Sequence, residues 1–282
     1  MKNERKFKPV TIIFIIAILV LLFTDLFPFY WTAISSLQPN LEIMKGTTQL
    51  IPKKITLKNY KDLLFESSGF TAFRNYIFNS LKVSLSVAIL SIIISVFGAY
   101  GLSHYDFWGK EFIHKFLLFI YVFPTILIIL PVYAIFSKFH LVDTHISLIL
   151  VHTTLASPFC TWLLRSFFDS VPKELEEAAI IDGCSRFYAV VRVTIPLAAP
   201  GILTAGIYAM VSSWGEYIFV QILINSGSKK TVPLALAGYM GHVDVQWGRL
   251  LAGSVLNVIP ILIIFLPLTK SFLKGFMEGA LK

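Results

Sequence analysis

The sequence contains few charged residues. Of its 282 residues, 14% are Asp, Glu, Lys or Arg, and its mean hydropathy is +0.75. A soluble domain usually carries about 25% charged residues. So few charges do not cover the surface of a water-soluble protein of this size, which excludes an ordinary soluble domain. We therefore expect lipid to face much of the chain.

Residues for metal binding and covalent chemistry are also scarce. The two cysteines, Cys160 and Cys184, lie far apart and fit neither a metal site nor a disulfide framework, so we expect free thiols. The six histidines are scattered and form no H-E-x-x-H pair. The net charge of +8 comes from basic residues spread between apolar runs, without the dense basic stripe typical of nucleic-acid binding. The sequence predicts no metal site, no nucleic-acid partner and no catalytic residues.

Long apolar runs dominate the sequence instead. A helix that crosses a bilayer needs about 20 apolar residues, at a rise of about 1.5 Å each. Candidate spans lie at approximately 10–34, 76–102, 112–137, 146–168, 198–224 and 250–272. The first run is longer than the apolar region of a signal peptide, which has about 7–15 residues, so we expect an uncleaved span. The predicted fold is an all-α integral membrane protein of six transmembrane helices, with one domain at 10–272 between tails at 1–9 and 273–282.

Basic residues indicate the orientation of these spans, because cytoplasmic segments are enriched in Lys and Arg. The N-terminal tail carries Lys2, Arg5, Lys6 and Lys8, and the short loops also favour a cytoplasmic N-terminus. The long loop between the first two spans carries six Lys or Arg and weakens this preference. With an even number of spans, we expect a multi-pass protein of the cell membrane with both termini in the cytoplasm.

Prolines interrupt several predicted spans. Each removes a backbone donor and kinks its helix, and membranes tolerate such breaks beside other helices or a water-filled cavity. The residues concerned are Pro28, Pro124, Pro131, Pro158 and Pro260. Each one alone is compatible with a bend packed in the bundle, but the set favours a transporter over a passive anchor.

The polar segment between the fourth and fifth predicted spans is the most informative. Pro172 suits the first position of a helix, where its missing N–H costs nothing, and Gly183 suits the end of one. The first turns carry three carboxylates, which the helix dipole favours: Glu174, Glu176 and Glu177. These residues predict a short cytoplasmic helix, which by itself is also compatible with an ordinary amphipathic connector.

The same segment resembles the EAA loop of binding-protein-dependent ABC importer permeases. The matching strings are Glu177-Ala178-Ala179, Asp182-Gly183 and Ile195-Pro196-Leu197. Other strings are similar to the carbohydrate-importer branch of that family, the MalG-like subunits: Asn79-Ser80-Leu81, Ala99-Tyr100-Gly101, Trp214-Gly215-Glu216-Tyr217 and the ending 274–282. The sequence departs from the pattern at Cys184, Val190 and Ile195, where Ala, an aromatic residue and Leu are usual. None of these departures removes the Glu or the Gly of the loop.

The resemblance implies a type I ABC importer permease whose EAA loop, residues 170–197, presents a coupling helix to a cleft on an ATPase. The coupling residues that it implies are Glu174, Glu177, Ala178, Ala179, Asp182 and Gly183. Glu177 would pair with a basic residue of the ATPase, and the two alanines would allow close helix approach. The implied partners are a second homologous permease, two cytoplasmic ATPases and an extracytoplasmic substrate-binding protein. The chain would form half of the translocation path.

The sequence has no nucleotide-binding motif of its own. No G-x-x-x-x-G-K-[ST] pattern occurs, and the stretch Gly227–Thr231 lacks the first glycine and the Gly-Lys step of that pattern. We therefore expect a transport subunit that is not an enzyme and holds no cofactor. ATP and Mg would be bound by the partner ATPase.

Polar and aromatic residues in the last two spans are candidates for the substrate path, because an ionisable group in a membrane is costly and tends to face a cavity. These candidates are Trp214, Glu216, Tyr217, Gln221 and Asn257. Hydrogen bonds between helices or to the partner permease are the alternative, and for Asn257 the preferred one.

The outer loop after the fifth span is a second candidate site. In similar permeases this loop reaches toward the substrate-binding protein. The candidate contacts here are Gly227, Lys229, Lys230 and Thr231. The alternative is a simple solvated connector.

The branch resemblance also implies a carbohydrate substrate, either an oligosaccharide or a sugar derivative. The main alternative function is an ion-coupled secondary transporter, which would be expected to show internal repeats and charge relays inside its spans. Neither is clear in this sequence. A membrane-embedded enzyme would need a nucleophile, a metal cluster or paired carboxylates, and no basic or metal-ligand group accompanies the acidic residues of the EAA segment.

Overall fold

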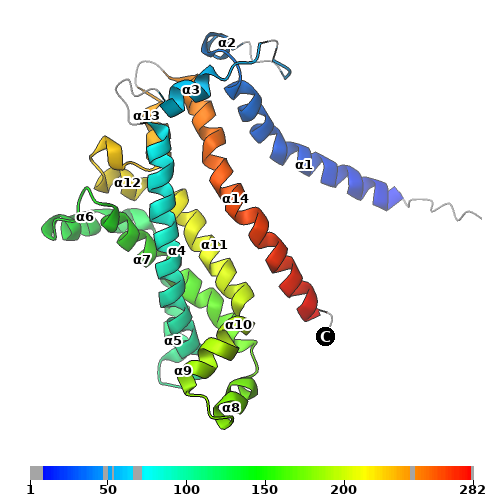
Figure 1. The fold of residues 1–282 in the computed structure, drawn as a ribbon, viewed down its shortest axis with the longest axis vertical. Coiled ribbons are helices and arrows are strands. Elements are labelled where there is room, and N and C mark those ends of the chain that lie inside the picture. The colour runs from blue at the N-terminus through cyan, green and yellow to red at the C-terminus, as the bar shows by residue number, and fades with distance from the viewer. Residues whose placement is uncertain (1–8, 47–49, 53, 66–71, 242–244, 281–282) are drawn as a thin grey trace, which may run out of the picture. The chain divides into compact units, whose positions relative to one another are not determined.

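The computed structural model describes residues 9–46, 50–52, 54–65, 72–241 and 245–280. Its regular elements are helices (Figure 1), and these residues also hold one isolated β-bridge, between Met240 and Val245. The chain divides into two compact units, residues 1–68 with 236–259 and residues 69–235 with 260–282. The all-α architecture predicted from the sequence is confirmed.

The first unit is held by a small polar core. It contains α1 (Pro9–Ser36), α2 (Asn40–Met44), α3 (Lys58–Phe65) and the start of α14 (Trp247–Ala280). Asn59 on α3 donates through Nδ2 to the carbonyl oxygens of Ser36 (2.8 Å) and Gln38 (2.9 Å). A Cβ on Gly248 would lie only 2.4 Å from Oδ1 of Asn59, so α14 approaches α3 at a residue without a side chain.

Three long helices form the second unit: α4 (Phe73–His104), α7 (His145–Asp169) and α11 (Ala199–Trp214). They pack through small residues, which allow close helix approach in membranes. The buried core includes Ala99, Ala156, Cys160 and Ala205, and Cys160 Sγ donates to the carbonyl oxygen of Ala205 at 3.4 Å. Cys160 and Cys184 are both free thiols, as predicted.

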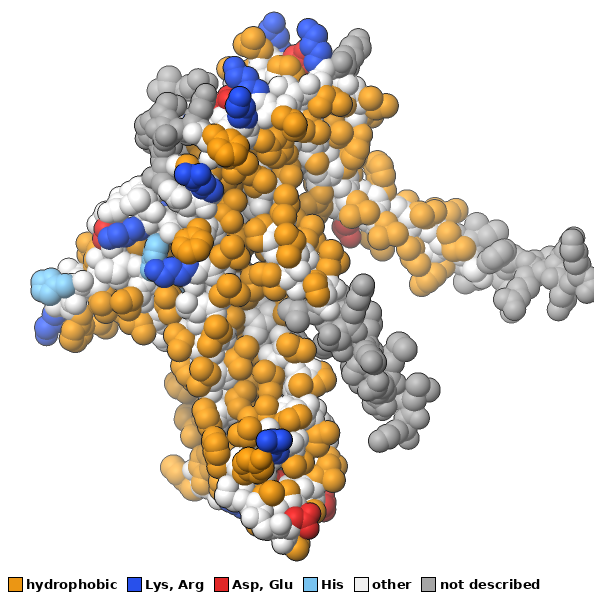
Figure 2. Space-filling view, in the orientation of Figure 1, with side chains coloured by type: hydrophobic (Ala, Val, Ile, Leu, Met, Phe, Trp, Pro, Cys, Tyr) orange, Lys and Arg blue, Asp and Glu red, His pale blue; other side chains and the backbone are white. Residues whose placement is uncertain are grey.

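The two faces of α4 show the distribution expected in lipid. Serines that are at most 2% exposed lie on its buried face: Ser80, Ser84, Ser91 and Ser95. Apolar residues that are 43–62% exposed lie on its outer face: Leu85, Ile89, Ile93 and Phe97. Figure 2 shows apolar side chains over much of the visible surface. Water would favour the reverse arrangement, so this surface is suited to a bilayer.

Within the described residues, four helices are long and apolar enough to cross a membrane, and the number rises to six if each of two bent helix pairs is one span. The six predicted spans match this larger number. Three of the five prolines noted in the sequence lie inside long helices: Pro28 in α1, Pro158 in α7 and Pro260 in α14.

The predicted third span is a broken helix. It consists of α5 (Lys110–Val122), η1 (Thr125–Ile128) and α6 (Ile129–Lys138), with a bend of 88°. Pro124 explains the break, because it lacks an N–H and favours an extended conformation at the preceding residue. Phe123 has that conformation, with φ −62° and ψ 131°.

The predicted fifth span, 198–224, is also not one continuous helix. α11 ends at Trp214, and α12 (Ile218–Leu223) follows as a separate helix. The carboxylate of Glu216 accepts the N–H groups of Phe219 (2.9 Å) and Val220 (3.3 Å) and so starts the new helix. This local competition for backbone donors has no signal in hydropathy.

Short elements complete the second unit and its connection to the first. They are α8 (Lys173–Ile181), α9 (Arg186–Ala189), the π-helical η2 (Val190–Thr194), α10 (Ile195–Leu197), η3 (Gly227–Lys229) and α13 (Val232–Gly238). The run from α9 to α10 meets α11 at a bend of 76°.

Candidate functional site

α8 is the helix predicted in the polar segment, and both of its ends are defined by sequence. Pro172, predicted as the first helical residue, is instead the N-cap, and α8 begins one position later at Lys173. Gly183, just beyond the other end, has φ +95°, a conformation that residues with a Cβ rarely adopt. The N–H of Gly183 donates to the carbonyl oxygen of Ile180 at 3.0 Å, and the N–H of Cys184 donates to the carbonyl oxygen of Ala179 at 3.0 Å. This pair of bonds is a Schellman motif, which fixes the direction in which the chain leaves α8.

The open face of α8 combines carboxylates with apolar side chains. Glu174, Glu177 and Asp182 are exposed. Ile181 beside them is 84% exposed, and Phe187 in α9 is 67% exposed. Figure 2 shows acidic and apolar side chains together where α8 lies. Exposed apolar groups with charges around them are typical of a protein–protein contact surface.

The inner face of α8 is held by one buried carboxylate. Glu176 is 5% exposed and accepts hydrogen bonds from the hydroxyls of Tyr100 (2.7 Å) and Thr194 (2.8 Å). Nε2 of His104 lies 3.4 Å from the same carboxylate. Tyr100 and His104 are one turn apart on α4 and their rings stack with centroids 4.3 Å apart. Glu176 therefore joins α8 to the end of α4 and to η2.

Polar contacts also join α4, α5 and α7 beside this point. The Ser103 hydroxyl donates to the Asp169 carboxylate at 2.6 Å, which links the ends of α4 and α7. Arg165 on α7 pairs with Glu111 on α5 and lies 3.4 Å from Asp169. α8 is thus attached to a base of three connected helices.

A small cavity lies where the fifth predicted span is broken. It has a volume of about 70 Å³ and is lined by His152, Leu155, Ala156, Tyr208, Ser212, Ser213 and Glu216. Nδ1 of His152 lies 2.8 Å from the Ser213 hydroxyl, and Nε2 lies 3.2 Å from the Glu216 carboxylate. Glu216 therefore bonds a neighbouring helix, which is one of the two alternatives left open by the sequence, and it also faces a hollow.

A larger cavity lies where the third predicted span is broken. It has a volume of about 400 Å³ and is lined by Phe119, Ile120, Tyr121, Phe123, Thr125, Ile128, Thr154, Leu155 and Tyr208. Leu155 and Tyr208 line both cavities. Interrupted helices within a membrane are tolerated where they line a cavity. Here the third and fifth predicted spans are both interrupted, and the cavities at the two breaks share Leu155 and Tyr208.

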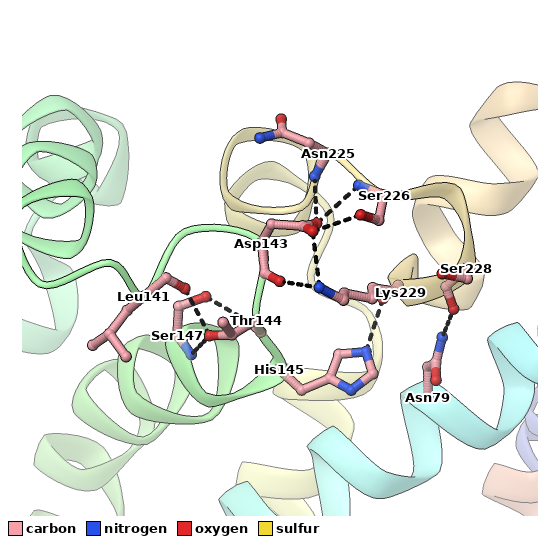
Figure 3. Close-up of polar contacts among 10 residues, drawn as sticks. All are labelled: Asn79, Leu141, Asp143, Thr144, His145, Ser147, Asn225, Ser226, Ser228 and Lys229. Atoms are coloured by element: carbon pink, nitrogen blue, oxygen red, sulfur yellow. Dashed lines mark hydrogen bonds and ion pairs between the residues drawn. The ribbon is translucent and has the colours of Figure 1, made fainter.

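The segment of residues 225–231, which we call the pinned segment, is held by side chains from other parts of the permease (Figure 3). Asp143, between α6 and α7, forms an ion pair with Lys229 at 2.8 Å. The Lys229 ammonium and hydrogen bonds from Ser226 hold the pKa of the Asp143 carboxyl well below its usual range. From α4, Asn79 donates to the carbonyl oxygens of Ser228 (2.8 Å) and Lys230 (2.9 Å).

Comparison with known proteins assigns the chain to a family. The family model described as the binding-protein-dependent transport system inner membrane component matches residues 91–274, a range that includes α8 and the residues lining both cavities. The chain belongs to this family. As a transport permease, it is neither the ion-coupled transporter nor the membrane enzyme weighed above, and its predicted resemblance to MalG-like subunits is confirmed.

Curated relatives cover almost the whole permease. YcjP of Escherichia coli, an inner membrane ABC transporter permease protein, is 32% identical over 93% of this chain and 92% of its own. MalG of Thermococcus litoralis, from a trehalose/maltose transport system, is 30% identical over 96% of both chains. DasC of Streptomyces coelicolor, from a diacetylchitobiose uptake system, is 31% identical over 93% of this chain and 94% of its own.

Solved structures show the same fold. A chain of a bacterial ABC transporter involved in the import of the acidic polysaccharide alginate aligns with a TM-score of 0.78 and 23% identity, over 94% of this permease and 99% of that chain. A chain from a bacterial alginate ABC transporter, in complex with an alginate pentasaccharide-bound periplasmic protein, aligns with a TM-score of 0.64 and 14% identity. The alignment covers 90% of this permease and 92% of that chain. The predicted permease fold is confirmed.

The structure brings most predicted coupling residues of this permease onto one open surface. Glu174, Glu177, Ala178, Asp182 and Gly183 are exposed. Ala179 is half-buried. Sequence reasoning missed the role of Glu176, which it treated only as a charge in the first turn. The available signal was the pair of polar rings one turn apart at the end of a predicted span, Tyr100 and His104.

The other predicted residues are dispersed. Of the five candidates for the substrate path, Glu216 lines a cavity, whereas Trp214 is 2% exposed and buried in the core. Tyr217 and Gln221 are exposed outside the lining described above, and Asn257 belongs to the other unit. His152 and Tyr208 were missed; an ionisable histidine inside an apolar span was the signal for the first.

The candidate contacts in the pinned segment differ in accessibility. Gly227 is exposed, Lys229 and Lys230 are half-buried, and Lys229 is already paired with Asp143. Thr231 is 4% exposed, so its side chain is buried within this permease.

Proposed function

We propose that this permease is one of two homologous subunits that form the translocation path of an ATP-driven sugar importer. In this proposal α8 is the coupling helix, and it docks in a cleft on a cytoplasmic ATPase. The observation that carries the proposal is the asymmetry of α8, because its inner face is bonded to α4 through Glu176 and its outer face is open. A helix held in this way transmits force from a partner to the membrane helices.

Each coupling residue has a physical role in this proposal. Glu177 pairs with a basic side chain of the ATPase, and Glu174 and Asp182 add to the negative field that attracts that surface. Ala178 and Ala179 let the ATPase approach the helix backbone. Gly183 permits the sharp exit that leaves the C-terminal end of α8 uncovered.

The length of α4 supports the proposed orientation. Asn79 contacts the pinned segment and Tyr100 contacts Glu176. These residues are about 21 positions apart, or roughly 32 Å along an α-helix, close to the thickness of the hydrocarbon core of a bilayer. With α8 in the cytoplasm, the pinned segment lies outside.

We place both termini in the cytoplasm, with the transmembrane domain at 10–272, the EAA loop at 170–197, and tails at 1–9 and 273–282.

The proposal requires partners that supply what this permease does not. Two cytoplasmic ATPases bind ATP and Mg, a second permease completes the path, and an extracytoplasmic binding protein delivers substrate. The family description, with its binding-protein-dependent transport, supports this assembly. This permease itself acts in conduction and coupling, and no cofactor is assigned to it.

The proposed substrate is an oligosaccharide or a sugar derivative. Relatives that support this belong to systems for trehalose and maltose, diacetylchitobiose, and arabinooligosaccharides. The two adjoining cavities offer suitable chemistry. Rings such as Tyr121, Phe123 and Tyr208 provide flat apolar faces, and His152 with Glu216 provides polar groups for hydroxyls.

Uptake by the reconstituted complex tests this function. The permease, its partner permease, the ATPase and the binding protein are placed in proteoliposomes and supplied with labelled maltose, trehalose, diacetylchitobiose or arabinooligosaccharides. We expect uptake of one class only when ATP and the binding protein are both present, and no loss when ionophores collapse ion gradients. Uptake that follows an ion gradient without ATP would overturn the proposal.

A further inference from the structure

The pinned segment differs from an ordinary surface loop in how much of its backbone is bonded to side chains of other elements. It follows α12, contains η3 and leads into α13. Figure 3 shows Asp143 and His145 from one side and Asn79 from the other pointing at it. The contacts of these three residues determine its conformation.

Asp143 uses all four of its polar atoms on the pinned segment or on the helix before it. Oδ1 accepts the backbone N–H groups of Asn225 (3.0 Å) and Ser226 (2.8 Å). Oδ2 accepts the Ser226 hydroxyl (2.5 Å) and the Lys229 ammonium (2.8 Å). The Asp143 carbonyl oxygen also accepts from Lys229 (2.6 Å), and its N–H donates to the carbonyl oxygen of Leu223 (2.7 Å).

The backbone of Asp143 is itself in a costly conformation. Its φ is +61°, in the left-handed region that residues with a Cβ seldom occupy. Such a conformation persists only where surrounding contacts over-determine it. Next to it, Thr144 caps α7 by accepting the N–H of Ser147 at 3.2 Å, so the turn that carries Asp143 is anchored to a long helix.

The backbone carbonyl groups of the pinned segment are bonded to side chains of α4 and α7. Asn79 Nδ2 donates to the carbonyl oxygens of Ser228 and Lys230. His145 Nε2 lies 2.9 Å from the carbonyl oxygen between them, that of Lys229. Three successive carbonyl groups are therefore held by side chains of other elements. Further on, Ser80 accepts the N–H of Val232 at 2.9 Å.

These contacts leave the apex of the pinned segment uncovered. Gly227 and Ser228 are exposed, as is Asn225. Ordering a flexible backbone costs about 1–2 kcal/mol per residue, and a segment that is ordered in advance does not incur this cost when a partner binds. The pinned segment thus has the features of a preformed contact element for a protein partner.

We propose that Asp143 is a positioning residue, which holds residues 225–231 in one conformation before the extracytoplasmic substrate-binding protein arrives. The inference rests on the proposed function, which places this end of α4 outside the cell. Asp143 acts through the segment and need not touch the binding protein. Its removal loosens the segment and weakens docking, but leaves α8, the ATPase contact and the path unchanged.

Two measurements on the assembled complex in lipid nanodiscs test this inference. Hydrogen exchange, recorded without binding protein, reports the order of residues 225–231, and titration with sugar-loaded binding protein gives the half-maximal concentration for ATPase stimulation. For Asp143→Ala we expect faster exchange in this segment and a half-maximal concentration raised about tenfold, equivalent to about 1.4 kcal/mol, with the maximal rate retained. Lys229→Met removes one partner and keeps the backbone contacts, so its shift should be smaller.

The outcomes separate this inference from the function on which it rests. If wild type is stimulated, and Asp143→Ala shows wild-type exchange and an unchanged half-maximal concentration, the positioning role is refuted while the importer assignment stands. If no loaded binding protein stimulates wild type, the proposed function itself fails. Should Asp143→Ala not assemble, Asp143→Asn has nearly the same shape and should shift both readouts in the same direction. A fall in maximal rate alone would also refute the inference.

Discussion

Replacing Glu176 with alanine tests how α8 is attached to the membrane helices. The carboxylate is 5% exposed and accepts hydroxyl hydrogen bonds from Tyr100 and Thr194. A hydrogen bond to a charged group contributes about 1.5–3 kcal/mol, so two lost bonds correspond to about 3–6 kcal/mol. Water entering the vacated space recovers part of this. We expect a net loss of about 3 kcal/mol, which increases the opening equilibrium of α8 roughly a hundredfold.

Hydrogen exchange of the amides of Lys173–Ile181, measured on the assembled complex in lipid, is the assay. Lys173→Ala is the matched control, because it removes a charge from an exposed position of the same helix that is not a proposed coupling residue. Exposed substitutions usually change stability by less than about 0.5 kcal/mol. Glu176→Gln keeps the shape and one acceptor oxygen, and should accelerate exchange only about tenfold. Equal exchange in Glu176→Ala and Lys173→Ala would refute the role assigned to Glu176.

Three further predictions concern other parts of the permease. Gly183→Val places a residue with a Cβ in the left-handed conformation, which costs about 1–2 kcal/mol, and we expect it to reduce the coupling of ATP hydrolysis to uptake. Gly101→Ala is the control, because a Cβ there meets open space, and it should leave coupling unchanged. Because Lys229 depresses the pKa of Asp143, the stabilisation from this carboxylate is present above its unfolded pKa of about 3.9 and is lost as pH falls toward the native value. Exchange protection of residues 225–231 should therefore stay constant from about pH 7 to 5 and decline only in stronger acid, and a decline near pH 6 would contradict this. His152→Phe fills the small cavity, and we expect it to lower sugar uptake more than binding-protein-stimulated ATPase activity. Equal losses of uptake and ATPase activity would contradict a role of His152 in the substrate path.

The long helices could be predicted from sequence because lipid imposes a simple rule on composition and length. α1, α4, α7 and α14 each follow from an apolar run. The break at Pro124 also had a signal, since proline removes a donor. The break after Trp214 depends on the Glu216 carboxylate accepting two backbone N–H groups. The sequence alone does not show whether a glutamate in a span bonds the backbone in this way or faces a cavity.

The candidate site was predictable where a motif carries the geometry. Gly183 and the exposed carboxylates of α8 were expected from the EAA pattern, and the structure places them on one surface. Glu176, Asp143 and His152 were not identified, because their importance comes from partners far away in sequence. Glu176 meets Tyr100 from 76 positions earlier, and Asp143 meets Ser226 from 83 positions later. Single-sequence reasoning has no access to such pairings.

ATPase activity of the complex in lipid, with and without sugar-loaded binding protein, tests most directly whether α8 couples this permease to its ATPase. Wild type is compared with Glu177→Lys and with Asp106→Lys, a charge reversal at an exposed residue outside α8, between α4 and α5. We predict that stimulation by the binding protein disappears in Glu177→Lys and persists in Asp106→Lys, with both complexes assembled. Full stimulation and uptake in Glu177→Lys would contradict the assignment of α8 as the coupling helix.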